Sequence, residues 1–240
     1  MVSKKISLHL NSNKPKSFQA LIHSIIKNTH NIKTIEIIVN IDKNDNEMKE
    51  IINDFNNIYP QLITFLETDI IKDFSDAWKT LNLILKNTSE QVVLLACISD
   101  DLRFITKNWD KILLSYENRF EDGIYRLRCS KFKNKIYNDL WECGYAPDAY
   151  SFYSISWIKI VGQWCPCIGP DSFQECISFY MKNISSKYDR NIIVEEINFS
   201  GESVSSGINL KTRISRTRIY YKAFFILMSY KNQKMALNIA

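Results

Sequence analysis

Two adjacent carboxylates, Asp100 and Asp101, follow an almost wholly apolar stretch, residues 91–98. Carboxylates at the end of a buried strand are costly unless a positive group binds them. A divalent cation held by one or two carboxylates together with substrate phosphates is a common solution, because Mg²⁺ takes oxygen ligands and keeps several waters. A helix N-cap followed by a solvated aspartate is the alternative, and this feature alone leaves both interpretations open.

A further carboxylate, Asp42, follows the β-branched run of residues 34–41, and Asp45 lies close by. A carboxylate in this position could accept hydrogen bonds from the edge of a nucleobase or from a ribose hydroxyl. Aspartate is also common in Asx-turns, where its side chain bonds to the backbone two residues on. On its own, Asp42 fits such a turn better than a binding site.

Predicted strands and helices alternate along the first hundred residues. An alternating or continuous apolar pattern indicates the strands, and apolar residues at helical spacing indicate the helices. The strands are residues 6–10, 34–41, 62–66 and 91–98, and the helices are one that begins at Ser17, residues 48–58 and residues 74–87. This order predicts an α/β fold with a parallel sheet.

The polar residues that follow these strands are expected at one edge of the sheet. Ligands of open parallel sheets bind beyond the carboxyl ends of the strands, so chemistry is expected at this edge. The residues are Asn11, Ser12, Asn13, Asp42, Asp45, Asp69, Ser99, Asp100 and Asp101.

The pattern changes after Asp101. Residues 102–116 are expected to form a loop and a helix anchored by Trp109, and residues 129–171 are aromatic-rich and irregular. The remaining predicted elements are a strand over residues 123–127, a helix over 171–183, a strand over 191–197 and a basic, aromatic helix within 211–240.

The composition excludes several classes of protein. Six glycines and five prolines in 240 residues rule out a collagen-like or low-complexity chain. No apolar run approaches the roughly 18 residues of a membrane span, and the apolar stretch after Met1 is too short for a signal peptide, so we expect a cytosolic protein. The net charge of +5 suits a polyanionic partner, such as a nucleotide diphosphate or an acidic membrane face, without demanding one.

The six cysteines, at positions 97, 129, 143, 165, 167 and 176, do not form a zinc-binding pattern. None belongs to a C-x2-C pair, and Cys165 and Cys167 are too close together for two ligands of one tetrahedral site. The three histidines lie far upstream. We expect buried or half-buried thiols in a reducing compartment.

Residues 5–115 resemble the GT-A-type, family 2 nucleotide-sugar glycosyltransferases. The matching motifs, in order, are residues 10–15 (Leu-Asn-Ser-Asn-Lys-Pro), Ser24-Ile25, residues 35–39 leading to Asp42, and Ser99-Asp100-Asp101 at the position of the family's DxD-like motif. Residues 150–175 resemble the family more loosely. The resemblance implies a GT-A-like, Rossmann-type, mostly parallel sheet flanked by helices, with an irregular acceptor-side region and a C-terminal helix.

The resemblance also implies roles for individual residues. Asp101 matches the ligand to Mn²⁺ or Mg²⁺, the cation that bridges the diphosphate, and Asp100 matches the position that approaches the ribose or the sugar. Asp42 matches the carboxylate that reads the base, usually uracil. Asn11 and Ser12 match the loop beneath the nucleoside.

In the second half of the chain, Asp171 matches the catalytic base of inverting members of the family. Its alternative is the N-cap of the helix that follows. Lys72 and Lys79 are both candidates for the basic residue that contacts the diphosphate. Many members also have a histidine as a metal ligand near the C-terminal strand, but residues 195–203 contain none, and Glu202 could take its place.

These roles predict a metal-dependent enzyme that transfers a sugar from a nucleotide diphosphate, UDP as the carboxylate at Asp42 implies, to an acceptor hydroxyl with inversion. Residues 1–115 would form the nucleotide-sugar-binding half, residues 116–210 the acceptor-side and catalytic half, and residues 211–240 the C-terminal helix. A non-catalytic nucleotide- or sugar-binding protein is the alternative, favoured by the missing histidine. A nucleotidyltransferase fits less well, because residues 11–16 contain no glycine for a phosphate-binding loop.

The family resemblance also implies the binding partners. They are a nucleotide-sugar donor and a glycan, lipid-linked or protein acceptor, and no nucleic acid is expected. Residues 211–230 place basic residues beside an aromatic apolar run, a pattern that suits peripheral contact with a membrane. A helix packed on the sheet or on a second copy of the chain is the favoured interpretation of this segment.

Overall fold

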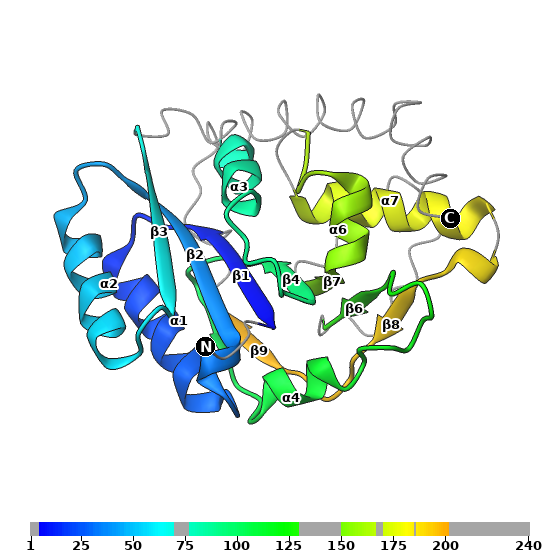
Figure 1. Cartoon of the computed structure of the whole chain (residues 1–240), viewed down its shortest axis with the longest axis horizontal. Coiled ribbons are helices and arrows are strands. Elements are labelled where there is room, and N and C mark those ends of the chain that lie inside the picture. The colour runs from blue at the N-terminus through cyan, green and yellow to red at the C-terminus, as the bar shows by residue number, and fades with distance from the viewer. Residues whose placement is uncertain (1–4, 70–76, 130–149, 167–169, 185, 202–240) are drawn as a thin grey trace, which may run out of the picture.

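The computed structural model describes residues 5–69, 77–129, 150–166, 170–184 and 186–201. Its centre is a seven-stranded sheet with strand order β3-β2-β1-β4-β7-β6-β8 (Figure 1). The strands are β1 (Ile6–Asn11), β2 (Ile35–Asp42), β3 (Ile63–Thr68), β4 (Leu94–Cys97), β6 (Arg126–Arg128), β7 (Ser151–Ser154) and β8 (Asn191–Ile193). Only β7 runs opposite to its neighbours. The mostly parallel α/β sheet expected from the sequence is confirmed.

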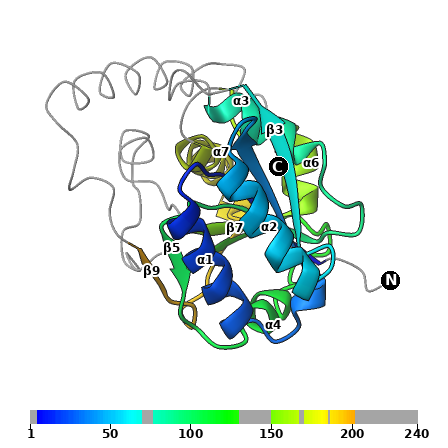
Figure 2. The same ribbon diagram turned by 90° about the vertical axis from the view of Figure 1, so that its left-hand side faces the viewer.

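Helices cover both faces of this sheet (Figures 1 and 2). On one face, α1 (Pro15–Asn28), α2 (Asn46–Ile58) and α4 (Trp109–Leu114) pack into the larger apolar core. On the other face, α3 (Ala77–Leu85), α6 (Ile155–Val161) and α7 (Pro170–Ile184) pack into a second core. Two short 3-10 helices, η1 (Ile32–Thr34) and η3 (Ser186–Tyr188), complete the helical elements described. Within the described residues, none of the helices has the length and apolarity needed to traverse a bilayer.

The predicted elements of the first hundred residues are confirmed, with small shifts at their ends. Helix α1 begins at Pro15 rather than Ser17, because proline lacks the N–H that the first helical turn leaves unbonded anyway. Both faces of β4 are buried, as its continuous apolar sequence predicts: Leu94, Leu95 and Ala96 are at most 1% exposed.

The order of the strands reverses beside β1. The chain passes from β1 outward through β2 to β3 and then returns to the opposite side of β1 to form β4. In open α/β sheets a ligand crevice forms at such a switch point, beyond the carboxyl ends of the two strands that flank it. The residues that follow β1 and β4 therefore lie where a ligand is expected.

The second half differs from the expectation in three places. The segment expected to be a loop after Asp101 contains β5 (Leu102–Phe104), which pairs with β9 (Phe199–Gly201) in a separate two-stranded sheet. The predicted strand over residues 191–197 ends at Ile193, and the chain then turns toward β9. The stretch expected to be irregular contains β7 and α6.

Strand β7 was not predicted, because its aromatic residues fall within a segment expected to be irregular, whereas the structure buries them in the core. Phe152, Tyr153 and Trp157 are at most 3% exposed, and β7 lies between β4 and β6. Helix α6 follows without a loop: the Ser154 side chain accepts a hydrogen bond from the Trp157 N–H at its start, and Gly162 ends the helix at φ 77°.

The cysteines that the structure describes have the predicted environments. Cys129, Cys165 and Cys176 are buried, and Cys97 is half-buried. Cys143 and Cys167 lie outside the described residues.

Candidate active site

The switch point between β1 and β4 brings two predicted site residues into contact. The Ser12 hydroxyl, just after β1, donates a 2.8 Å hydrogen bond to Oδ2 of Asp100, which follows β4. Asp100 is 8% exposed and Ser12 is 6% exposed. A hydrogen bond to the ionised form stabilises a buried carboxylate, so the Ser12 hydroxyl holds Asp100 in a defined orientation at the carboxyl edge of the sheet.

Asn11 joins the same edge to α3. The Thr80 hydroxyl on α3 donates a 2.7 Å hydrogen bond to Oδ1 of Asn11, the last residue of β1. Ser12 therefore contacts Asp100, and Asn11 fastens α3 to the end of β1.

Asp101 is half-buried next to Asp100, and its Oδ1 accepts a hydrogen bond from the Ser99 hydroxyl. Asp100 and Asp101 supply hard carboxylate oxygens, the donor type that Mg²⁺ and Mn²⁺ prefer. Among the described residues, no group of three or more histidine, cysteine, aspartate or glutamate side chains gathers as a complete metal site. A cation held by a carboxylate of this pair would take its other ligands from phosphate oxygens and water.

Asp42 ends β2 at the same edge of the sheet and is half-buried. The turn that follows is closed by other groups: the backbone N–H of Asp45 donates to the Asp42 carbonyl, and the Asp45 side chain caps α2 by accepting from Met48 N–H. Across the part of the chain that the structure describes, no side-chain or backbone donor hydrogen-bonds the Asp42 carboxylate. The helix-capping role belongs to Asp45.

Asp171 lies in the first turn of α7, where a negative charge is favoured by the helix dipole. Because α7 begins at Pro170, Asp171 is the second residue of the helix. The Asp171 charge is close enough to β4 to affect Cys97: burial, and then the Asp171 carboxylate, raise the pKa of the Cys97 thiol.

The segment that leads to Asp171 is fastened to α3. Oδ1 of Asn82 accepts a 2.7 Å hydrogen bond from the Trp164 N–H, and Nδ2 of Asn82 donates to the Cys165 carbonyl at 2.7 Å. The Trp164 indole N–H donates a 2.8 Å hydrogen bond to Nδ1 of His9 on β1. This connects the segment that precedes Asp171 directly to the strand that carries Asn11.

Helix α7 is held by further polar contacts, two of them made by Gln174 and one by Glu175. Gln174 donates to the carbonyl of Trp164 at 2.8 Å and accepts from the Trp157 indole at 2.8 Å. Glu175 forms a buried ion pair with Arg126 of β6. Gln174, Glu175 and Arg126 do not follow predicted strands, so the sequence did not identify them. The tryptophans of the same region were the sign in the sequence that this part of the chain packs into a core.

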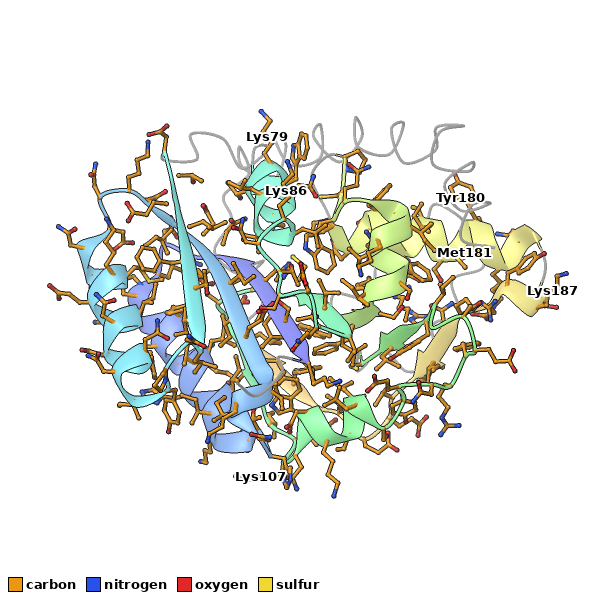
Figure 3. The ribbon with its side chains drawn as sticks, viewed as in Figure 1. Lys79, Lys86, Lys107, Tyr180, Met181 and Lys187 are labelled. Carbon is orange, nitrogen blue, oxygen red and sulfur yellow. The ribbon has the colours of Figure 1, made fainter. Side chains whose placement is uncertain are left out.

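Lys79 is exposed on α3, whereas the other predicted site residues that the structure describes are buried or half-buried. Its ammonium lies 5.9 Å from the centre of the Trp78 ring. Figure 3 shows its side chain extending outward from α3. Lys72, Glu202 and residues 211–240 lie outside the described residues.

The fold is shared with nucleotide-sugar glycosyltransferases of known structure. The mannosyltransferase PcManGT from Pyrobaculum calidifontis, solved with GDP-Man and Mn²⁺, is 12% identical with a TM-score of 0.64, and the match covers 99% of this chain and 74% of that one. S. aureus TarS 1-349, solved with UDP-GlcNAc, is 11% identical with a TM-score of 0.63, over 97% of this chain and 70% of that one. No family model and no curated protein matches the sequence. The chain has the GT-A glycosyltransferase fold.

Proposed function

We propose that this protein transfers a sugar from a nucleotide diphosphate, with uridine as the nucleoside, to an acceptor hydroxyl, with inversion at the anomeric carbon. The observation that carries the proposal is the contact between Ser12 and Asp100 at the β1–β4 switch point. It gathers the DxD-like carboxylates where this fold is expected to bind a ligand. The GDP-Man and UDP-GlcNAc complexes of structures with the same fold support a nucleotide-sugar donor.

In the proposed site, Asp101 would hold Mn²⁺ or Mg²⁺, and Asp100 would approach the ribose or the sugar of the donor. A cation held there would supply positive charge opposite the leaving diphosphate. Ser12 keeps the Asp100 carboxylate in place through its 2.8 Å hydrogen bond. Asn11 and Ser12 lie beneath the nucleoside, and Asp42 accepts a hydrogen bond from the base. Lys79 remains a candidate for contact with the diphosphate.

Asp171 is proposed as the general base. Its carboxylate removes the proton of the acceptor hydroxyl as that oxygen attacks the anomeric carbon. The new bond forms on the face opposite the bond to the diphosphate, which breaks, so the nucleoside diphosphate leaves with the bonding electrons. The half-buried position of Asp171 near the end of β4 supports this role. Residues 1–115 then form the donor half of the domain and residues 116–210 the acceptor half.

A non-catalytic nucleotide- or sugar-binding protein is the second candidate. It is favoured by one observation: within the described ranges, the acidic pair has no third acidic, histidine or cysteine ligand beside it. Such a protein would bind the donor but leave it intact.

The test combines binding with turnover. Thermal-shift measurements with UDP, GDP, CDP, ADP and their sugar conjugates, with and without Mn²⁺, should give a metal-dependent rise in Tm with a uridine diphosphate compound. Release of free nucleoside diphosphate in the presence of glycan or lipid-linked acceptors then separates the two candidates. Binding without release under any acceptor supports the binding protein, and the absence of any nucleotide-dependent shift refutes both.

A further inference from the structure

The inward face of α7 carries a row of polar side chains that begins at Asp171. Gln174 and Ser178 follow Asp171 by three and seven residues, so the three side chains share one face of the helix. Asp171 is half-buried, whereas Gln174 is completely buried and Ser178 is 5% exposed. A buried polar group is costly unless it is hydrogen-bonded, so the partners of these side chains constrain how α7 is turned about its axis.

Gln174 makes three hydrogen bonds with its carboxamide. Its Oε1 accepts from the Trp157 indole N–H on α6 at 2.8 Å, and its Nε2 donates to the carbonyls of Gln163 and Trp164 at 3.1 Å and 2.8 Å. The carboxamide cannot be reversed, because its oxygen would then face two carbonyls and its NH2 group would face the indole N–H. Gln174 therefore holds the first turns of α7 in one orientation against α6 and Trp164.

Trp164 is in turn fixed to the elements that carry the donor end of the site. Its backbone N–H donates to Oδ1 of Asn82 on α3 at 2.7 Å, and its indole N–H donates to Nδ1 of His9 on β1 at 2.8 Å. Strand β1 leads to Ser12, which hydrogen-bonds Asp100. A continuous series of contacts thus connects the strand beside the acidic pair to the first turns of α7.

The position of a general base must be held closely. A base acts within hydrogen-bonding distance of the proton that it removes, and a misplacement of about 1 Å can reduce the rate about 100-fold. Because Asp171 belongs to α7, its carboxylate moves with the start of that helix, where Gln174 makes its contacts. Ser178 lies one turn further along and donates to Oδ1 of Asn191, the first residue of β8, at 2.9 Å, so it anchors the middle of the helix instead.

We propose that Gln174 is a positioning residue for Asp171: its carboxamide fixes the start of α7 against Trp164 and Trp157 and so places the Asp171 carboxylate at the acceptor hydroxyl. Gln174 is completely buried, so it acts through Asp171 and not on the substrate. This inference rests on the proposed function, because it takes Asp171 to be the general base, and it adds the residue that holds that base in place.

The first test uses Gln174→Met in the full chain, since methionine keeps the length of the side chain and removes all three hydrogen bonds. The kcat of sugar transfer should fall about 10- to 100-fold, because the base is no longer held at the acceptor. Donor affinity should stay within about two-fold of the wild type, because the lost interaction acts on the chemical step.

Ser178→Ala is the matched control. It also removes a buried hydrogen bond from the same face of α7, so its Tm should fall below that of the wild type. Its kcat should stay within about two-fold of the wild type, because it leaves the contacts of Gln174 intact. A loss of kcat in Ser178→Ala as large as that in Gln174→Met would overturn the assignment, since any weakening of α7 would then have the same effect.

A double-mutant cycle with Asp171→Asn distinguishes positioning from a general loss of structure. In the Asp171→Asn protein, Gln174→Met should lower transfer less than about two-fold, because no base is left to misplace. A merely structural role would lower transfer by the same factor with and without Asp171. Additive effects in the cycle, or a wild-type kcat for Gln174→Met, would overturn the assignment.

Trp157→Phe serves in the same cycle if Gln174→Met does not fold, because it keeps an aromatic ring and removes only the N–H that holds Oε1 of Gln174. Hydrogen–deuterium exchange reports the anchoring without any assay of activity. The amides of residues 174–177 should exchange faster in Gln174→Met or Trp157→Phe than in Ser178→Ala, because the start of α7 opens more readily. Unchanged exchange of these amides would overturn the assignment.

Failure of this inference can be told apart from failure of the proposed function. If the wild type transfers sugar and Asp171→Asn does not, but Gln174→Met is fully active, only the positioning assignment falls. If Asp171→Asn is also fully active, sugar transfer stands, and both roles that depend on Asp171 fall. If the wild type transfers no sugar to any acceptor, the proposed function falls and the positioning assignment falls with it.

Discussion

Nδ1 of His9 accepts a 2.8 Å hydrogen bond from the indole N–H of Trp164, 155 residues away in the sequence. Nε2 of His9 lies 2.8 Å from the Ser7 hydroxyl and 3.1 Å from the Thr88 hydroxyl. His9 is fully buried, and burial lowers its pKa to about 3. A neutral imidazole that accepts at Nδ1 thus joins β1 to the segment that precedes Asp171.

Acid should destabilise the protein through His9. Protonation is favoured in the unfolded chain below its usual pKa of about 6.5 but opposed in the folded protein down to about pH 3. The contribution of His9 is therefore fully present above about pH 6.5 and is lost as the pH falls toward 3, with a limiting slope of about 1.4 kcal/mol per pH unit.

Urea unfolding between pH 4 and pH 8 measures this effect. The variant His9→Gln cannot titrate, so the difference between its unfolding free energy and that of the wild type should shrink as the pH falls. His30→Gln is the control substitution at an exposed histidine. Parallel pH profiles for the wild type and His9→Gln would contradict the prediction.

Asp101→Asn should abolish the metal-dependent part of nucleotide binding and leave the fold intact, because it removes one charged oxygen donor from the acidic pair. Thermal shift with UDP, with and without Mn²⁺, measures this loss. Asp45→Asn is a matched control at the same edge: Asp45 caps α2, and asparagine caps about as well as aspartate. Metal-dependent binding by Asp101→Asn at the wild-type level would show that the metal assignment is wrong.

Asp42→Ala should weaken nucleotide affinity by roughly 1–3 kcal/mol, the range for a lost hydrogen bond to a charged group. It should not lower the stability of the unliganded protein, since no donor from the described residues hydrogen-bonds this carboxylate. Calorimetric titration with UDP and a urea unfolding curve give the two values. Asp69→Ala is the control, because the Asp69 side chain is 89% exposed and pairs only with the surface residue Lys43 among the described contacts. Unchanged UDP affinity for Asp42→Ala would remove Asp42 from the base site.

Asp171→Asn should reduce transfer by roughly 100-fold or more, while donor affinity changes little, because a general base acts on the acceptor. Ser172→Ala in the same helical turn serves as the control for local disturbance. A fully active Asp171→Asn protein would reject the catalytic assignment.

The amino-acid sequence by itself determined the local elements of the first hundred residues and the carboxylates at their ends. The periodicity of β1, α1, β2 and α2 is a property of consecutive residues, so their types could be predicted without knowing their neighbours. For the same reason Asp42 was expected close to the end of a strand, where it is the last residue of β2, and Asp100 and Asp101 were correctly expected after a strand.

The tertiary structure alone decided which of these elements are neighbours. The position of β4 beside β1, and with it the contact between Ser12 and Asp100, depends on strand order, which local patterns do not encode. Likewise β7 is a strand because it completes the sheet between β4 and β6, and its aromatic side chains are buried there. The hydrogen bonds from Trp164 to His9 and to Asn82 arise from packing between distant segments. Burial in a folded core determines the energetic consequence of such polar groups, and burial exists only once the chain has folded.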